Sequence, residues 1–297
     1  MAANKPGKAE ILAAFFDDGT YSPLFTDGAV SAAYGCANGQ NAYVVFEDGS
    51  PVGVQDIEKN IRVLEMAAET GAPVVTFYDS TGAKLEGGLA LLNANARLTA
   101  EIARVSGVVP QIAVVTGTCA GTNAINAASA DVCVMAEDAE LFLNAPFNTP
   151  DGKLEGAGKA ANAAKSGVAD ILAKDDAEAI AKAKKLAAIL PANNISLAGN
   201  DDFAENDAAV SASMKGADLV AALADKNSTV ELGAEFGNAA YTAFASVNWA
   251  TVAFVATDKA AKLTAADCAK IARFVQLADV FSIPVVTVVN TEGFEAV

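Results

Sequence analysis

The sequence predicts an α/β fold with a largely parallel sheet, made of two copies of one unit of which the second is incomplete. Three observations support this prediction. Short apolar segments alternate with amphipathic ones, glycine-containing turns separate them, and the segment from Gly71 to Gly82 recurs from Ser282 to Gly293. Alternating strands and helices are typical of parallel sheets, because parallel neighbours are joined by a crossover that is usually a helix.

The first elements follow from periodicity and turn residues. Residues 8–17 carry apolar side chains at helical spacing before an Asp-Gly turn, which predicts a short helix. Residues 42–46 are rich in β-branched and aromatic side chains and predict a strand after the turn Asn38-Gly39. From Val54, apolar residues recur at i, i+3 and i+4 until Gly71, so an amphipathic helix is predicted with Gly71 as its C-terminal cap.

A second strand and helix follow in the same order. Residues 74–78 predict a buried strand, and apolar residues from Leu92 to Val105 predict a helix that ends before Gly107. Between them lies the turn 79–84, in which Asp79 is expected to orient the loop by an Asx turn rather than to act in acid–base chemistry.

The stretch from Gly107 to Met135 is the centre of the predicted fold. It contains an apolar run at 108–115, a turn of small residues at 116–122, an alanine-rich segment with the length of a short helix, and a second apolar run at 132–135. The predicted order is strand, turn, helix, strand. A turn of this kind directs main-chain N–H groups and the positive end of a helix dipole at a bound anion or oxyanion.

The remaining elements suggest where the chain divides. Residues 175–190 predict a helix that Pro191 stops, and the polar segment 193–207 is the expected linker. A helix at 217–225 and a strand at 251–256 follow. We therefore predict one domain at 1–200 and the first part of a second domain at 201–297.

The two related segments lie 211 residues apart and share an x-Pro-Val-Val-Thr core followed by a glycine turn. A repeat of this kind indicates a duplicated α/β unit. The first copy continues for more than a hundred residues past Gly82, whereas the sequence stops four residues past Gly293. We expect the chain to be a fragment or one half of a split protein.

Composition excludes several functional classes. The chain of 297 residues has a net charge of −16, which argues against nucleic acid because phosphates require a basic surface. Its apolar runs are shorter than the roughly 20 residues that cross a bilayer, and its N-terminus has no secretory signature. Four widely spaced cysteines suit reduced thiols, so a cytoplasmic protein is expected.

The chain contains no histidine. It therefore cannot build a Ser-His or Cys-His nucleophile or a His-rich zinc site from its own residues, and no metal site is expected. Cys119 is accordingly interpreted as a small packing residue rather than a nucleophile.

Several motifs resemble the carboxyltransferase subunits of biotin-dependent acyl-CoA carboxylases and decarboxylases, such as propionyl-CoA carboxylase beta chains. The resemblance covers nearly the whole chain, and its motifs occur in the family's order. They are Gly71-Ala-Pro-Val, Asp79-Ser-Thr-Gly-Ala-Lys-Leu-Glu-Gly87, Ser106-Gly-Val-Val-Pro-Gln-Ile112 with Cys119-Ala-Gly121, Lys165-Ser-Gly-Val-Ala-Asp170, Leu190-Pro-Ala-Asn-Asn194, and residues 279–294.

The resemblance implies two crotonase-like domains, each a ββα superhelix, and transfer of CO2 between carrier-bound carboxybiotin and a short acyl-CoA. It further implies biotin on a separate carrier protein, a homo-oligomer such as a dimer or a trimer of dimers, and possible association with a membrane decarboxylase. In this family the biotin ureido anion, formed when carboxybiotin releases CO2, removes the α-proton of the acyl-CoA. The protein therefore has to stabilise enolate oxyanions and hold the reactants together.

The site residues are assigned on the same basis. The N–H groups of Gly121 and Thr122 are expected to form an oxyanion hole, with Gly82 and Ala83 lining the same pocket. Further contacts to the acyl-CoA are assigned to three more residues: Lys84, Ala120 and Cys119. Tight turns that need glycine only for positive φ, and a solvated lysine at position 84, are the plain structural alternatives.

Two other functions remain open from the sequence. One is a crotonase-type acyl-CoA hydratase or isomerase, which would need a carboxylate that reaches the pocket. The other is a non-catalytic assembly subunit of a carboxylase or decarboxylase complex.

Overall fold

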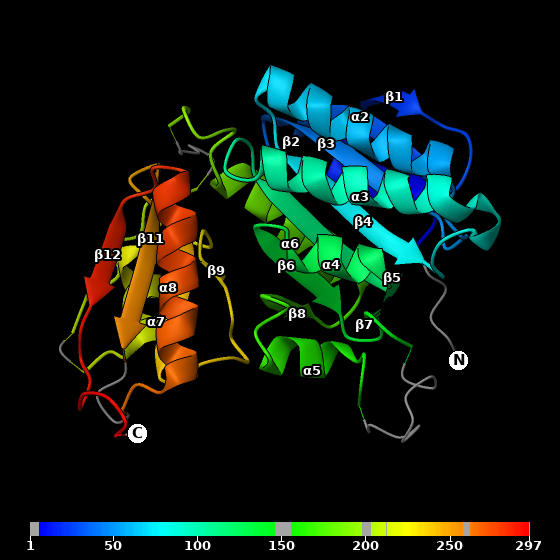
Figure 1. The fold of residues 1–297 in the computed structure, drawn as a ribbon. Coiled ribbons are helices and arrows are strands. Elements are labelled where there is room, and N and C mark those ends of the chain that lie inside the picture. The colour runs from blue at the N-terminus through cyan, green and yellow to red at the C-terminus, as the bar shows by residue number, and fades with distance from the viewer. Residues whose placement is uncertain (1–5, 146–155, 198–202, 212, 258–261, 297) are drawn as a thin grey trace.

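The structure is a computed structural model that describes residues 6–145, 156–197, 203–211, 213–257 and 262–296. Its strands form two sheets with helices packed on and between them (Figure 1). The first sheet belongs to the first copy of the predicted unit, and the second sheet to the later copy.

The first sheet has the strand order β1-β2-β3-β4-β5-β6-β8, with β7 paired to the end of β5. The pairs β1–β2 and β2–β3 are antiparallel, whereas the pairs from β3 onward are parallel. Parallel pairing was therefore predicted correctly for the centre of the sheet. The strands are β1 (Tyr21–Phe25), β2 (Val30–Ala37), β3 (Gln40–Glu47), β4 (Val74–Ser80), β5 (Gln111–Ala120), β6 (Val132–Ala136), β7 (Glu140–Phe142) and β8 (Ile171–Ala173).

Helices cover both faces of this sheet because neighbouring strand residues point in opposite directions. Val45 and Val74 pack against one pair of helices, and Val44 and Val75 against another pair. The first pair is α2 (Val54–Thr70) and α3 (Gly88–Val105); the second pair is α1 (Lys8–Phe15) and α6 (Asp176–Ile189). Gly71 caps α2 in the left-handed conformation, at φ 68°, as predicted.

The second sheet has the order β12-β11-β10-β9, and α7 (Gly216–Leu223) and α8 (Ala265–Val280) pack against it. One apolar core contains side chains of α6, α8 and both sheets, so the two sheets share a continuous interior. The strands are β9 (Val230–Glu231), β10 (Ala240–Val247), β11 (Ala250–Thr257) and β12 (Val285–Val288).

The predicted duplication is visible in the contacts. The isolated parallel bridge between Val52 and Ala83 recurs between Leu263 and Phe294, again 211 residues later. The element order β2-β3-α2-β4 of the first copy likewise recurs as β10-β11-α8-β12.

A buried Asp–Lys arrangement repeats at the same offset. Asp56 accepts hydrogen bonds from the N–H groups of Gly53 and Ala29, at 3.0 and 3.1 Å. Its counterpart Asp267 accepts from Thr264 and Ala239, both at 2.8 Å. Lys59 and Lys270 then bind main-chain carbonyl oxygens beside these carboxylates: Val30 O at 3.2 Å and Ala240 O at 2.7 Å.

Several boundaries differ from the prediction. The strand expected at 108–115 begins at Gln111 and runs through Ala120, because the small residues 116–120 continue pairing with β4 and β7 instead of turning. The strands β1, β2, β7, β8, β9 and β10 were not predicted. The domain boundary at residue 200 lies outside the described residues and stays a proposal.

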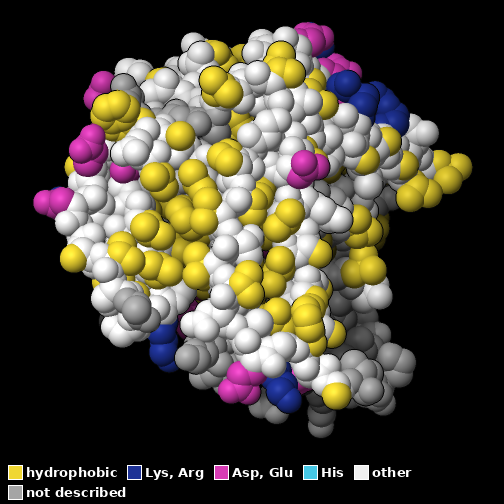
Figure 2. All heavy atoms as spheres, turned by 90° about the vertical axis from the view of Figure 1, so that its left-hand side faces the viewer, with side chains coloured by type: hydrophobic (Ala, Val, Ile, Leu, Met, Phe, Trp, Pro, Cys, Tyr) yellow, Lys and Arg dark blue, Asp and Glu magenta, His cyan; other side chains and the backbone are white. Residues whose placement is uncertain are grey.

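The outer strand of the second sheet is exposed. Among the described residues β12 pairs with β11 alone, and the face of the molecule that carries β12 is rich in hydrophobic side chains (Figure 2). Val285 and Val286 are exposed there, whereas their counterparts Val74 and Val75 are buried: β5 pairs beside them and helices of the first copy cover both faces.

Arg273 on α8 connects the two copies. Its guanidinium donates to Gly167 O at 3.0 Å and lies 3.4 Å from the carboxylate of Asp170. Burial raises the pKa of Asp170 to about 6, and the positive charge of Arg273 opposes that rise.

Replacement of Arg273 by glutamine is expected to destabilise the fold by about 1 kcal/mol, with a larger loss at pH 8 than at pH 5. Without Arg273 the pKa of Asp170 rises further, so ionising that carboxyl in the folded protein costs more. At pH 5 the carboxyl is mostly protonated and the cation contributes less. Urea unfolding at both pH values measures this difference. Arg62→Gln, at an exposed pair with Glu65, is the matched control, and an equal loss at both pH values would contradict the account.

Candidate functional site

The candidate site lies beyond the ends of β4 and β5. These strands run in parallel, and Ser80 on β4 is the partner of Cys119 on β5. Ala83 and Thr122 each follow three residues after this pair, beyond the ends of two neighbouring strands at the same edge of the sheet. The structure thus brings together the two predicted loops, which are 39 residues apart in the sequence.

Both loops turn at a glycine with positive φ. Gly82 has φ 116° and Gly121 has φ 64°, conformations that side chains rarely adopt. A Cβ atom added at either position would meet no heavy atom within 4 Å. The space in front of both glycines is therefore open, and conformation rather than crowding requires glycine.

The N–H groups of these loops are not all available. Gly121 N–H donates to Phe142 O at 3.0 Å, and Gly82 N–H donates to Ser80 Oγ at 3.2 Å. The predicted role of Gly121 as an oxyanion donor is therefore wrong, because parallel pairing of β5 with β7 turns its N–H away from β4.

Two other N–H groups of these loops have no described acceptor: that of Thr122, which was predicted as a donor, and that of Ala83, which was predicted to line the pocket. Among the described residues, neither Ala83 N–H nor Thr122 N–H donates to any acceptor. Ala83 forms a parallel bridge with Val52, in which Val52 N–H donates to Gly82 O and Lys84 N–H donates to Val52 O. The N–H of Ala83 itself therefore points away from Val52, to the side where β5 lies. Thr122 begins α4 (Thr122–Ala128), and a first-turn N–H has no acceptor within its own helix.

Of the three residues predicted to contact the acyl-CoA, Cys119 and Ala120 lie at the end of β5. The Cys119 side chain is fully buried among Tyr78, Val115 and Met135, and burial raises the pKa of its thiol well above the usual value. It packs as predicted and is not a nucleophile in this environment. A contact of Cys119 with a ligand would require its main chain. Ala120 is half-buried at the end of β5.

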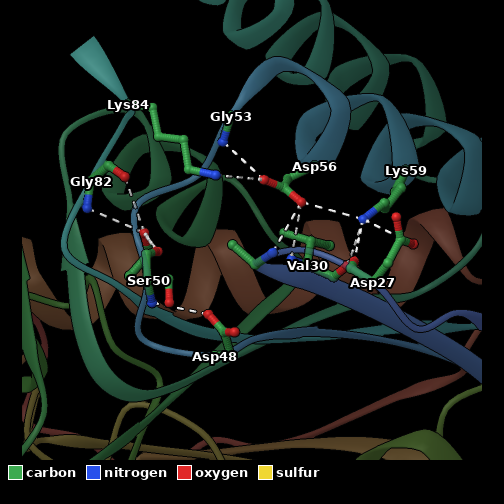
Figure 3. A network of polar contacts seen from close by, with 11 residues as sticks. Asp27, Val30, Asp48, Ser50, Gly53, Asp56, Lys59, Gly82 and Lys84 are labelled. Atoms are coloured by element: carbon green, nitrogen blue, oxygen red, sulfur yellow. Dashed lines mark hydrogen bonds and ion pairs between the residues drawn. The ribbon is translucent and has the colours of Figure 1, made fainter. Parts of the chain in front are cut away.

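Lys84 points back toward the start of α2. Its Nζ lies 3.8 Å from Asp56, in a network that also includes Gly53 and Lys59 (Figure 3). Burial raises the pKa of Asp56, but hydrogen bonds from Gly53 and Lys59 outweigh it and lower the pKa below its ordinary value. The Lys84 side chain is 47% exposed, so its ammonium can exchange Asp56 for another anion.

The Asp79 side chain has a role that the sequence did not predict. Its carboxylate accepts from Thr118 N–H at 3.1 Å and so ties β4 to β5. A Cβ atom at Gly117 would lie 2.0 Å from this carboxylate, which explains the glycine in the middle of β5.

Sequence reasoning missed a buried carboxyl beside the site. Glu47 ends β3, is 2% exposed, and accepts from Asn123 Nδ2 at 2.9 and 3.0 Å through its two oxygens. Burial raises the pKa of Glu47 to about 8, with an additional contribution from the negative charge of Asp79. The hydrogen bond from Asn123 opposes this rise. The sequence feature that could have identified this carboxyl is its position: Glu47 directly follows the apolar run 42–46, at the end of a predicted strand where the predicted turns lie.

The described residues include neither a metal-binding cluster nor a helix that could span a membrane. Within the described part of the chain, no group of three or more His, Cys, Asp or Glu side chains could hold a metal ion. None of the helices described has both the length and the apolar character needed to cross a membrane.

Comparison with known proteins identifies the family. The model of the carboxyl transferase domain matches residues 6–296. The chain belongs to the carboxyl transferase domain family. The 12S subunit of methylmalonyl-CoA carboxyltransferase from Propionibacterium freudenreichii subsp. shermanii is 32% identical over 90% of the chain and 56% of that protein. The propionyl-CoA carboxylase beta chain of Roseobacter denitrificans is 30% identical over 90% of the chain and 58% of that protein.

Solved structures agree with this assignment. Transcarboxylase 12S, determined with methylmalonyl-CoA and methylmalonic acid bound, superposes with a TM-score of 0.87 at 28% identity, over 99% of this chain and 65% of that one. The carboxyl transferase chain thus spans between half and two thirds of the length of these relatives. The predicted α/β, crotonase-like fold class is confirmed.

Replacement of Glu47 by glutamine is expected to make stability less sensitive to pH. The folded pKa of about 8 lies above the ordinary 4.5, so the folded protein holds this proton more tightly than the unfolded chain does. The contribution of Glu47 to stability therefore falls as pH rises from 4.5 to 8, by up to about 5 kcal/mol.

Thermal unfolding between pH 5 and pH 9 tests this expectation. The Tm of the natural chain should fall relative to that of Glu47→Gln as pH rises. Glu65→Gln on α2, a half-exposed position, serves as the control. Parallel curves for Glu47→Gln and the natural chain would show that Glu47 is ionised throughout.

Proposed function

We propose that this chain is the CoA-binding part of a biotin-dependent acyl-CoA carboxyltransferase, acting on a short acyl-CoA such as propionyl-CoA or methylmalonyl-CoA. The main support for the proposal is a pair of N–H groups, those of Ala83 and Thr122, that have no acceptor among the described residues and lie just beyond the paired ends of β4 and β5. Family membership and the names of the relatives support the reaction class.

The chemistry suits a chain without histidine. Carrier-bound biotin supplies the carboxyl group in such reactions, and the acyl-CoA reacts at its α-carbon as an enolate. The protein has to stabilise negative charge on the thioester oxygen, and main-chain N–H groups need no proton transfer to do so. Each correctly placed donor lowers the barrier by about 2.7–4 kcal/mol.

Ala83 and Thr122 would hold the thioester oxygen between the two loops. The open space in front of Gly82 and Gly121 leaves room for the acyl group and the start of the pantetheine arm. The exposed ammonium of Lys84 is placed to meet an anionic group of CoA once it leaves Asp56.

The surface beside the site suits assembly. Leu85 and Leu89 are 91% and 84% exposed on the segment that follows Lys84, and Leu92 is exposed one turn later. Exposed leucines grouped in this way are typical of a protein interface. We propose a homo-oligomer in which another subunit and a biotin carrier protein approach this edge; the related transcarboxylase 12S is described as a hexamer.

The alternatives receive less support. A hydratase or isomerase of the crotonase type needs a carboxylate that reaches the thioester. Glu47 lies beside the site but is 2% exposed and bonded to Asn123, and Asp79 is bonded to Thr118. A non-catalytic assembly subunit would not require open N–H groups at this position.

Titration calorimetry of the full chain with propionyl-CoA, and with CoA as control, tests the proposal. A mixture with a biotinylated carrier protein and labelled methylmalonyl-CoA then measures carboxyl exchange. We expect propionyl-CoA to bind and label to reach biotin. Binding without exchange in the assembled complex would favour the non-catalytic subunit, and hydration of an enoyl-CoA would favour the hydratase.

A matched pair of substitutions at Thr122 tests the oxyanion site. Proline is tolerated at the first position of a helix, so Thr122→Pro removes the N–H while α4 is retained. We expect carboxyl exchange to fall by roughly 10²–10³-fold in Thr122→Pro. Thr122→Ala keeps the N–H and should lose only a few-fold. Equal losses in the two variants would assign the effect to the side chain instead.

A further inference from the structure

A small polar cavity lies inside the first copy, enclosed by residues of α2, α3, α4, β4 and β5. The space open to the centre of a water molecule is about 10 Å³, which is room for one water and for no larger ligand. Five polar side chains line it, each at most 8% exposed: Asn60, Thr76, Tyr78, Gln111 and Asn126. Polar groups in an apolar interior need hydrogen-bond partners, so the contents of this cavity matter to all of them.

The Asn126 side chain has one polar atom without a partner. Its Oδ1 accepts from Thr99 Oγ1 on α3 at 2.8 Å, whereas Nδ2 has no hydrogen-bond partner among the described residues. The residue is only 1% exposed. Turning the amide by 180° would pair Nδ2 with Thr99 and leave Oδ1 without a partner instead. In either orientation one atom of the amide requires a partner that the described residues do not supply.

Asn60 brings the same requirement from α2. It is 4% exposed on the buried face of that helix, among apolar residues such as Ile61 and Leu64. No hydrogen bond to its side chain occurs within the described part of the chain. Two buried amides that need partners therefore line one cavity with the capacity for a single water.

Asn126 also contributes to the position of α4. It lies one helical turn after Thr122, whose N–H is a proposed oxyanion donor. The buried apolar residues of α4 are small, Ala124 and Ala127, and its single large apolar residue, Ile125, is 44% exposed. Hydrogen bonds of the Asn126 side chain are therefore important for the position of this short helix on the sheet.

We propose that the cavity binds a single internal water, which hydrogen-bonds to the Asn126 side-chain amide and joins it to the Asn60 side chain. A water has two donor and two acceptor positions, so it can serve both amides at once. It thereby fastens α4 to α2 and fixes the first turn of α4, with the Thr122 N–H, at the edge of the sheet. Asn60 and Asn126 are positioning residues. The water site follows from the cavity alone, whereas its link to the reaction rests on the proposed function.

A crystal structure of the full chain without ligand, at a resolution that shows ordered waters, tests the site itself. We expect one water within hydrogen-bond distance of both the Asn126 and the Asn60 side chains. An empty cavity, or a direct hydrogen bond between the two asparagines with the cavity closed, would overturn the proposal.

Substitutions at Asn60 test the connection to α4. Asn60→Val offers no polar group and occupies the place of the water, whereas Asn60→Ser keeps a hydroxyl that can bind it. Hydrogen exchange of the amides at 126–129, which donate to carbonyl oxygens within α4, measures how firmly the helix is held. We expect protection to fall about tenfold in Asn60→Val and by less than about threefold in Asn60→Ser. Gln55→Val, at an exposed position of α2, is the matched control and should change nothing.

A role of Asn60 in filling space alone predicts the opposite order. Serine would then enlarge the cavity, while valine would pack it better. Protection in Asn60→Ser that is equal to or lower than in Asn60→Val would therefore contradict the proposal. The crystal structure of the natural chain decides the water site even if Asn60→Val does not fold.

Carboxyl exchange with propionyl-CoA and a biotinylated carrier connects the water to the candidate site. Because an oxyanion donor acts in the transition state, we expect kcat to fall roughly tenfold in Asn60→Val with KM nearly unchanged, and Asn60→Ser to retain most of the rate. If the natural chain shows no exchange, the proposed function fails, while the crystal structure and the protection data still decide the water site. Lower protection with an unchanged rate would overturn the link between the water and the site.

Discussion

The parallel register between β4 and β5 is the constraint on which the site depends. It places Ser80 opposite Cys119, and the chain leaves both strands at the same edge with a glycine two residues later. One residue further on, Ala83 and Thr122 present N–H groups that no described acceptor occupies. A slip of one residue would move every side chain of β5 to the other face of the sheet, so the packed core fixes the site.

The same edge gathers carboxyl groups, which the fold has to neutralise without histidine and with few cations. Asp56 is stabilised by main-chain N–H groups and Lys59, Asp79 by Thr118 N–H, and Glu47 by keeping its proton. The Asp–Lys arrangement recurs in the second copy as Asp267 and Lys270, where it again holds the start of a helix against the preceding hairpin. The duplication therefore repeats one structural arrangement in both copies.

Much of the fold could be predicted because its signals are local. The periodicity of α2, its glycine cap and the x-Pro-Val-Val-Thr strands each depend on a few neighbouring residues, and the repeat at 211 residues links the copies. The strand β2 was missed because its small residues and Gly35 lack a β-branched pattern. The availability of Gly121 N–H could not be predicted, since it is decided by pairing with β7 some twenty residues away.

The Glu47–Asn123 contact could not be predicted from the sequence for the same reason: it joins residues 76 positions apart, across an intervening strand.

A crystal structure of the full chain with propionyl-CoA tests the central claim most directly. The account predicts the thioester oxygen within hydrogen-bond distance of both Ala83 N and Thr122 N, with the acyl group in front of Gly82 and Gly121. A thioester bound elsewhere, or one whose oxygen contacts side chains while these two N–H groups face away, would contradict it.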